Sequence, residues 1–320
     1  MHSRGAVLAD DATGALECAS LLAGLGVETA IVLENEPGRE LPGGVLVIDT
    51  ESRHLPSGEA GARIKRWAER LRTYRIFKKT DSTLRGNIAA ELMALGPVVY
   101  VPAYPALGRT VKNGRLFVHG VPLEKTEFAG DARHAVRSSV IAALFPAGAE
   151  VVIHDADTDD DLVRIAAGLS AEAVVAGPAG FIKHWADFPV KAPEPWPVVD
   201  NWLVVCGSLH PQSRRQAAVA RSLGLTVVAS SEERKLSAED AATELALRAA
   251  KLIRRPCGVL IMGGDTAWAL WRALGIETLT ALPEVLPGVA ACRAGDLTIV
   301  TKAGGFGDDN LVQAVIDRFR

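Results

Sequence analysis

The stretch AVLADDATGALECASLLA, residues 6–23, joins a short aliphatic run to a helical pattern through a polar turn. Residues 6–9 have the length of a buried strand, and a helix is predicted at residues 16–23. The same unit recurs almost from end to end of the chain. Continuous aliphatic strands spaced by helices are typical of a parallel sheet covered on both faces. We therefore predict an α/β fold.

The other predicted elements continue the alternation of short strands and longer helices. Strands are predicted at residues 29–33, 45–48, 75–78, 98–101, 151–154, 173–176, 203–206, 225–229, 258–262 and 297–301, and helices at residues 58–72, 88–95, 238–253 and 309–319. Residues 110–122 are an exception, because Asn113-Gly114 in their middle is a typical β-hairpin turn.

A domain boundary is predicted within residues 185–201, WADFPVKAPEPWPVVDN, which contain four prolines and no apolar periodicity. Proline fixes φ and lacks a backbone donor, so this composition favours a linker. A rigid loop inside one domain is the alternative. We predict two domains, residues 1–190 and 191–320, with largely parallel sheets flanked by helices and an active site in the cleft between them.

Composition excludes several classes of protein. The net charge of -3 over 320 residues leaves no basic excess for a nucleic-acid backbone, so no nucleic-acid partner is expected. No apolar run reaches the roughly 20 residues of a membrane helix, and the short apolar start is not a signal peptide. The four scattered cysteines form no CxxC pair, which suits buried thiols in a reducing compartment. A cytoplasmic protein without a membrane partner is expected.

Several well-known catalytic and nucleotide-binding motifs are absent from the sequence, and this excludes further classes of protein. The chain has no GxxxxGK[ST], no complete dinucleotide fingerprint, no HExxH and no GxSxG. Its seven histidines show no metal-ligand spacing, so no protein-built metal site is predicted. His119, His154 and His210 are interpreted as structural residues.

Polar side chains gather where the strands of the first half end, which is where doubly wound sheets bind ligands. Asp10 and Asp11 follow the first strand, and Thr13 leads into the next helix. Two adjacent carboxylates can accept a proton from a hydroxyl or hold Mg²⁺. The alternative is that Asp11 or Thr13 caps the helix, but one cap suffices.

Later strands of the first half add charged and hydroxyl side chains at the same edge. Arginine can clamp a carboxylate bidentately, and lysine can act as a point charge on an anion. The candidates that follow the third, fourth and fifth strands are Arg53, Lys79, Asp81, Ser82, Arg85, Asn87 and Arg109.

The second half has three glycine-bearing turns between a strand and a helix. Small residues let backbone amides approach a polyphosphate, and helix N-termini add partial positive charge. Ordinary turn chemistry, in which glycine supplies a positive φ, is the alternative for any one turn. Three such turns together favour a nucleotide, and the candidates are Ser208, Gly263, Gly264, Asp265, Thr266, Lys302, Gly304 and Gly305.

Taken together, these motifs resemble the four-carbon acid sugar kinase family, which includes D-threonate, D-erythronate and 3-oxo-tetronate kinases. The matching stretches appear in family order and cover nearly the whole chain. They are ADDATGA (9–15), DTESR (49–53), KKTDSTLRGN (78–87), PAYPALGRTVKNGRLFVHGVPLEKTEFAGD (102–131), CGS (206–208), GGDT (263–266), PEVLPGV (283–289) and TKAGGFGDD (301–309).

The resemblance implies a sugar-acid-binding domain at residues 1–190 and a nucleotide-binding domain at residues 191–320. It implies ATP with Mg²⁺ as cofactors, a small sugar acid as substrate and, as a further expectation, a homodimer. Asp10, Asp11, Asp81 and Arg85 are the expected catalytic residues, with Asp11 preferred as the base. Two departures from the family are a shorter chain and Ala12, which stands where the family often has an aromatic.

Other functions stay open at this point. The chain is alternatively a kinase for another aldonate or a branched acid, or a catalytically silent sugar-acid sensor. A Rossmann dehydrogenase is a more distant alternative.

Overall fold

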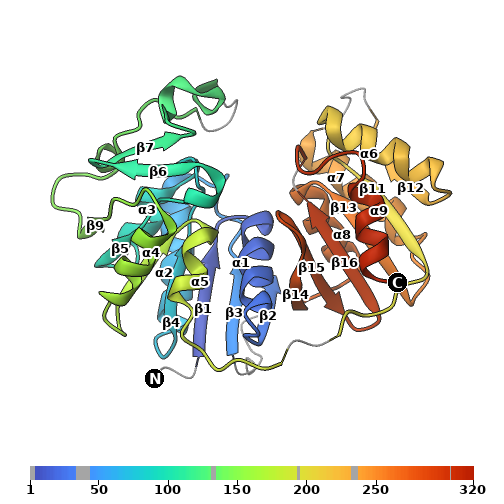
Figure 1. The fold of residues 1–320 in the computed structure, drawn as a ribbon, viewed down its shortest axis with the longest axis horizontal. Coiled ribbons are helices and arrows are strands. Elements are labelled where there is room, and N and C mark those ends of the chain that lie inside the picture. Colours follow the sequence, from blue (N-terminus) through green and yellow to red (C-terminus); the bar gives the residue numbers. More distant parts are fainter. Residues whose placement is uncertain (1–3, 34–43, 131–134, 193–194, 232–236, 303) are drawn as a thin grey trace.

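The computed structural model describes residues 4–33, 44–130, 135–192, 195–231, 237–302 and 304–320. In this described part, the main sheet has thirteen strands in the order β12-β11-β13-β16-β15-β14-β2-β3-β1-β4-β10-β5-β9. Figure 1 shows the first half of the chain at one end of this sheet and the second half at the other end, with helices packed against it. The predicted α/β class is confirmed.

In the ranges that the structure describes, the first half supplies seven neighbouring strands that all run parallel. Each lies where a strand was predicted, with small shifts at its ends. They are β1 (Arg4–Ala9), β2 (Thr29–Leu33), β3 (Gly44–Asp49), β4 (Arg75–Lys79), β5 (Val98–Tyr100), β9 (Val151–Ile153) and β10 (Val174–Gly177), and the associated helices are α1 (Ala12–Gly24), α2 (Ser57–Arg70), α3 (Ile88–Met93), α4 (Asp159–Ala167) and α5 (Ile182–Trp185).

Among its described residues, the second half supplies four parallel strands and four helices. The predicted elements are confirmed with small shifts at their ends. The strands are β11 (Trp202–Cys206), β12 (Thr226–Ala229), β13 (Cys257–Met262) and β16 (Leu297–Lys302), and the helices are α6 (Pro211–Ser222), α7 (Ala238–Ala250), α8 (Gly264–Ala273) and α9 (Leu311–Arg318).

Two further strands, which the sequence did not reveal, join the halves. β14 (Thr278–Leu286) pairs antiparallel with β2 on one side and with β15 (Val289–Ala294) on the other. The register of β14 shifts between Leu282 and Leu286, around Pro283. Proline cannot donate to a strand ladder, so a proline inside an apolar run argues against a strand from sequence alone.

Helix α1 lies against this junction. Its Ser20 hydroxyl donates to the carbonyl of Ala291 in β15 at 3.4 Å and accepts from the amide of Ala291 at 3.2 Å. Small buried side chains along α1, among them Ala15 and Ala19, allow this close packing. Because the helix is covered by both halves, it is apolar nearly all round rather than amphipathic.

The predicted hairpin forms a separate small sheet from β6 (Arg109–Lys112), β7 (Arg115–Val118) and β8 (Val121–Pro122). Asn113 and Gly114 have φ values of 52° and 68°, as the turn requires.

The linker prediction was wrong at its beginning, because Trp185 is fully buried and packs against Phe77 and Phe188. An extended stretch follows: the amide of Lys191 donates to the first half, at Gly26, and that of Val199 donates to the second half, at Phe319. Residues 193–194 of the predicted linker lie outside the described residues, as do Asp131 and Ala303 of the two long motifs.

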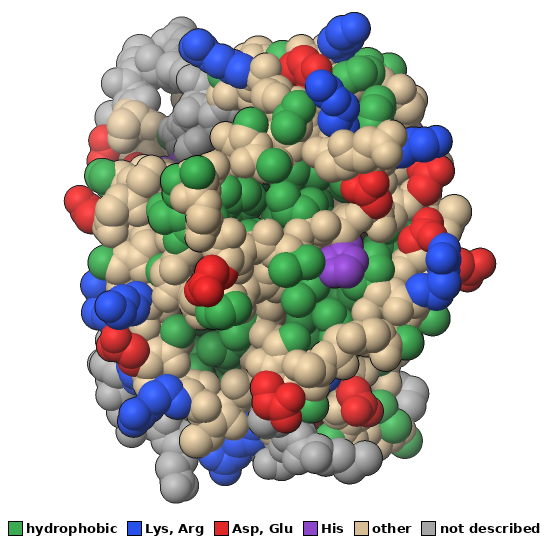
Figure 2. Space-filling model, turned by 90° about the vertical axis from the view of Figure 1, so that its left-hand side faces the viewer, with side chains coloured by type: hydrophobic (Ala, Val, Ile, Leu, Met, Phe, Trp, Pro, Cys, Tyr) green, Lys and Arg blue, Asp and Glu red, His purple; other side chains and the backbone are tan. Residues whose placement is uncertain are grey.

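The β9 end of the sheet faces the viewer in Figure 2, where hydrophobic side chains lie open between scattered acidic and basic ones. Val152 of the edge strand β9 is 57% exposed. None of the helices in the described ranges combines the length and apolarity needed to cross a membrane.

Candidate active site

The first-half candidates lie where the chain changes direction across the sheet. β1 and β4 are neighbours, but the chain leaves β1 through α1 toward β2 and leaves β4 through α3 toward β5, on the opposite side. Such a switch point opens a crevice at the carboxyl ends of the two strands. Asp10 and Asp11 follow β1, and Asp81 follows β4 within two residues.

The second half repeats this arrangement. β11 and β13 are neighbours, and the chain leaves them toward β12 and β14, which lie on opposite sides. The Gly207-Ser208 and Gly263-Gly264 turns therefore share a second switch point. They are in close contact, because a methyl group at Gly207 would lie 1.8 Å from the Thr266 hydroxyl oxygen.

The two switch points meet at the N-termini of α1 and α8. A methyl group added at Gly264 would lie 2.6 Å from the Thr13 hydroxyl oxygen, so the two helix starts touch. Three antiparallel pairings separate β2 from β16. The contact between Thr13 and Gly264 nevertheless places the carboxyl edges of the two halves next to each other. The acidic set and the glycine turns thus belong to one locus.

Asp10 is a buried carboxylate held by Arg53. Arg53 Nε and Nη2 donate to its two oxygens at 2.7 and 2.9 Å, and the Asp10 side chain is 2% exposed. Burial alone would raise the pKa of Asp10, but the charges of Arg53 and Lys78 outweigh it and hold the pKa below its ordinary value. Asp10 is therefore a fixed anion.

Asp11 carries out both roles considered from sequence. Its Oδ1 accepts the amide of Gly14 at 2.8 Å, so it caps α1, and its Oδ2 pairs with Arg53 Nη1. Its side chain is 26% exposed, far more than that of Asp10 or Asp81. Thr13 does not cap the helix; its hydroxyl points to Gly264.

Both carboxylate oxygens of Asp81 accept hydrogen bonds from residues of its own loop. Its oxygens accept from Arg85 Nε at 3.1 Å and Nη2 at 2.8 Å, and from the Thr83 hydroxyl at 2.6 Å. Burial opposes ionisation, but Arg53 and Arg85 lower the pKa of Asp81 well below its ordinary value. A carboxylate held in this way is a poor proton acceptor. Ser82, next to it, is half-buried.

Lys79 lies in a buried network that the sequence only partly indicated. Its ammonium is 3.9 Å from Glu17 Oε2 and packs against Gly14. Burial raises the pKa of Glu17, although Lys79 opposes this, and the Tyr104 hydroxyl is hydrogen-bonded to the same carboxyl. Glu17 was missed because it lies inside a predicted helix, where an isolated glutamate is usually a surface residue.

Glu51, in the DTESR motif, is a second site residue that the sequence pattern did not indicate. Its φ is 46°, and its amide donates to the buried Asp49 at 3.0 Å. Burial, followed by repulsion from Asp265 and Asp11, raises the pKa of Glu51 to about 7. Glu51 thus places a first-half carboxyl group close to the start of α8.

Two predicted binding residues, Asn87 and Arg109, donate hydrogen bonds to backbone carbonyls of loops. The Asn87 amide donates to the carbonyls of Ser52, Arg53 and Leu55, which fixes the loop that carries Arg53. The Arg109 guanidinium donates to the carbonyl of Leu107 in its own loop. The described contacts therefore do not join Arg109 to the acidic set.

The last glycine turn, which contains Gly304 and Gly305, is held by hydrogen bonds from buried side chains. Lys302 is 3% exposed, and its ammonium donates to the Gly304 carbonyl at 2.9 Å and to the Ser213 hydroxyl at 3.1 Å. The buried Gln216 amide donates to the carbonyls of Phe306 and Asp308 at 3.1 and 2.8 Å. These bonds leave the Gly304–Gly305 backbone facing Ser208, whose hydroxyl oxygen would be 2.6 Å from a methyl group at Gly304.

Nucleotide affinity is expected to fall as the pH rises past about 8. Burial lowers the pKa of Lys302 to about 8, so its positive charge is present at pH 7 and largely lost at pH 9. Calorimetric titration with ADP between pH 7 and 9.5 checks this. Lys302→Arg keeps its charge over the whole range, and its affinity should stay constant; a wild-type affinity that is equally constant would contradict the prediction.

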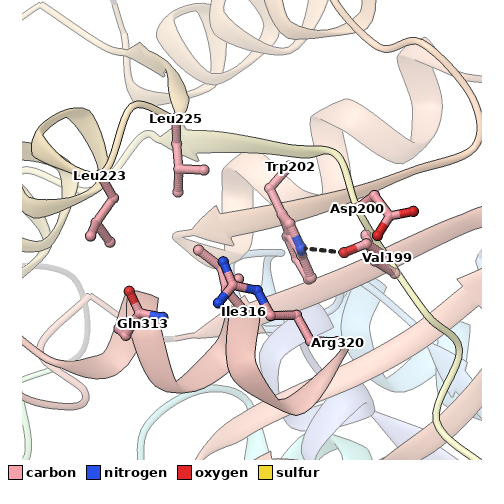
Figure 3. A pocket seen from close by; sticks show the side chains of 8 residues that line it. All are labelled: Val199, Asp200, Trp202, Leu223, Leu225, Gln313, Ile316 and Arg320. Atoms are coloured by element: carbon pink, nitrogen blue, oxygen red, sulfur yellow. Dashed lines mark hydrogen bonds between the residues drawn. The ribbon is translucent and has the colours of Figure 1, made fainter.

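A separate depression lies far from these turns. Figure 3 shows its lining residues, which come from α9 and the chain end after it, from the turn between α6 and β12, and from the start of β11 and the residues before it. The Trp202 indole donates to the Val199 carbonyl at 3.2 Å. Parallel sheets bind ligands at the carboxyl edge, so this depression is not the candidate site.

Comparison with known proteins identifies the family. Residues 5–147 match the model of a sugar-binding N-terminal domain, and residues 225–312 match that of a nucleotide-binding C-terminal domain. A D-threonate kinase of Cupriavidus necator is 30% identical, with 95% of each chain covered. Other curated relatives are D-erythronate and 3-oxo-tetronate kinases. The chain belongs to the four-carbon acid sugar kinase family, which confirms the resemblance found in the motifs.

Solved structures agree on the fold. A Salmonella typhimurium protein described as a putative tRNA synthase has a TM-score of 0.82 at 21% identity, and covers 99% of this chain and 98% of its own. A Bordetella bronchiseptica protein of a family of unknown function, solved with bound citrate as a domain-swapped dimer, has a TM-score of 0.51 at 29% identity and covers 98% and 97%. The first likeness shows the fold alone.

Proposed function

We propose that this chain transfers the γ-phosphoryl group of ATP to a hydroxyl of a four-carbon sugar acid such as threonate, erythronate or an oxo-tetronate. The contact between Thr13 and Gly264 is the observation that carries the proposal, because it joins an acid-and-arginine site to a set of glycine turns. Phosphoryl transfer requires that the acceptor hydroxyl and the nucleotide phosphates be positioned together. Residues 1–190 form the acid half in this proposal, and residues 191–320 form the nucleotide half.

The nucleotide half binds the phosphates of ATP. The Gly264 and Gly304-Gly305 backbone and the Ser208 hydroxyl face this region, and Thr266 lies beside Gly207. Helices α6 and α8 direct their N-termini to the same region. Lys302 adds positive charge beneath the last turn.

Mg²⁺ fits this locus only as an ion shared with the phosphates. In the described residues, no group of three or more Asp, Glu, His or Cys side chains could hold a metal ion. Asp265 and Glu51, which repel each other, are the carboxylates that a nucleotide-bound Mg²⁺ would face. Such a set suits Mg²⁺, which keeps its water and phosphate ligands, and the ion would supply charge neutralisation on the phosphates.

The acid half binds the sugar acid and deprotonates its hydroxyl. Lys79, Ser82 and Arg85 hold the substrate carboxylate and hydroxyls, with Arg85 kept in place by Asp81. Arg53 is committed to Asp10 and Asp11, so we assign it a positioning role. Asp11, the most exposed of the three aspartates, accepts the hydroxyl proton.

A coupled assay of ADP release tests the function across threonate, erythronate, their 2- and 3-oxo forms, and C5 and C6 aldonates. The proposal predicts the highest kcat/KM for a four-carbon acid. A maximum at a longer or branched acid would assign the chain to another aldonate. Thermal stabilisation by an acid without ADP release would instead indicate a catalytically silent sensor.

We further propose a cytoplasmic homodimer. All four cysteines lie in the described part of the chain and are buried free thiols, which suits a reducing compartment. The exposed β9 edge and the domain-swapped dimer of the Bordetella bronchiseptica protein support self-association.

A further inference from the structure

His210, which the sequence analysis set aside as structural, lies at the start of α6 beside the last glycine turn. Its Nδ1 accepts the amide of Gln212 at 3.1 Å, so its side chain caps the helix. Its own amide donates to the Ser208 hydroxyl at 3.1 Å. The side chain and the backbone amide of His210 are therefore both hydrogen-bonded within the turn that joins β11 to α6.

This capping bond determines where the ring carries its hydrogen. An imidazole nitrogen that accepts a hydrogen bond is unprotonated, so in a neutral ring the hydrogen is on the other nitrogen, Nε2. Within the described residues, no protein atom accepts a hydrogen bond from Nε2 of His210. The ring thus presents one unused donor.

The unused donor lies over the glycine turn. A methyl group added at Gly305 would be 3.2 Å from Nε2 of His210, and one added at Gly304 would be 3.3 Å from its Cβ. Lys302 lies beneath the same turn, and the N-terminus of α6 begins next to the ring. A donor that projects above this turn, near Lys302 and the N-terminus of α6, suits an anionic oxygen.

We propose that Nε2 of His210 donates a hydrogen bond to a phosphate oxygen of the bound nucleotide and so sets nucleotide affinity in this chain. This inference rests on the proposed function, because it takes the glycine turn to be part of the nucleotide site. The fixed Nδ1 bond provides preorganisation: the ring needs no rotation to present its donor.

Two substitutions separate the ligand role from the capping role. In His210→Asn, the shorter amide retains an oxygen that can cap α6 but loses the donor at the Nε2 position. In His210→Gln, the amide nitrogen can reach the Nε2 position, but the capping acceptor is lost. His210→Asn therefore keeps the capping role and loses the donor, whereas His210→Gln keeps the donor and loses the capping role.

The experiment is calorimetric titration of each variant with ADP and with a non-hydrolysable ATP analogue, together with a melting curve of each protein. His210→Asn is expected to keep the wild-type melting temperature and to bind nucleotide about tenfold more weakly. His210→Gln is expected to melt at a lower temperature and to stay within about threefold of wild-type affinity. The KM for the sugar acid should change in neither.

A merely structural histidine would give the reverse pattern, with His210→Asn binding nucleotide as tightly as the wild type and His210→Gln binding weakly. That result would overturn the inference and leave the proposed kinase function intact. If the wild-type chain binds no nucleotide in the same titration, the proposed function and the inference both fail.

Discussion

Replacing Asp11 by asparagine is expected to lower kcat by about 100-fold or more, with ATP still bound at near wild-type affinity. General base catalysis typically contributes a factor of about 10² to 10⁴, and asparagine cannot accept the proton. The change is conservative for the fold, because the asparagine oxygen can still accept the Gly14 amide that caps α1. Steady-state kinetics and an ADP titration of the variant measure both quantities.

Asp81→Asn is the matched comparison. The Asp81 carboxylate is occupied by Arg85 and Thr83, so this variant should mainly raise the KM for the sugar acid by loosening Arg85. Near-normal turnover of Asp11→Asn would reject Asp11 as the base. A loss of kcat confined to Asp81→Asn would transfer the role to Asp81.

Replacing Arg53 by methionine is expected to reduce the free energy of unfolding by about 3–5 kcal/mol at pH 7, the usual cost of leaving a buried charge without its partner. Asp10 is 2% exposed and would lose two charge-assisted hydrogen bonds. Urea unfolding monitored by tryptophan fluorescence measures the loss.

The pH dependence of this loss provides an independent check. In the wild type, the pKa of Asp10 lies below its ordinary value of 3.8, so the stabilisation from ionised Asp10 is complete above that pH and is lost as the pH falls through the lowered folded-state pKa. Without Arg53, burial dominates and raises the pKa of Asp10. The variant should therefore lose less stability at pH 5 than at pH 7.

The double variant Asp10→Asn/Arg53→Met is the control, because it removes the buried charge together with its partner. It should recover part of the stability that Arg53→Met loses. A loss below about 1 kcal/mol in Arg53→Met would mean that Asp10 has other sufficient partners, and would remove the positioning role from Arg53.

The sequence predicted most of the fold because each strand, turn and helix unit is local. The run of residues 6–23 encodes β1, its acidic turn and α1 without reference to the rest of the chain. What it could not predict is the junction, since the pairing of β14 with β2 joins residues more than 240 positions apart and Pro283 disguises the strand. Nothing in a local pattern indicates such a partner.

Part of the candidate site was predictable because it follows from the same local pattern of strand, turn and helix. The rest depends on contacts between distant segments and was missed. Polar residues that follow strands were found because position along the strand reveals them, as with Asp10 and Asp81. Glu17 and Tyr104 enter the site from a helix interior and a loop, and only the packing of α1 against both halves brings Glu17 to Lys79. Arg53 was predicted to bind the substrate, but its bonds to Asp10 and Asp11 favour a positioning role, which no local pattern reveals.

Transfer of an isotopic label tests the central claim most directly, because ADP release alone does not distinguish phosphorylation from hydrolysis. ATP labelled with ¹⁸O in its γ-phosphate is incubated with the protein and threonate, erythronate or an oxo-tetronate, and the products are analysed by mass spectrometry. We predict a labelled sugar-acid phosphate formed in equal amount to ADP. Label found only in inorganic phosphate, with every acid unmodified, would contradict a single site that joins the acid to the nucleotide.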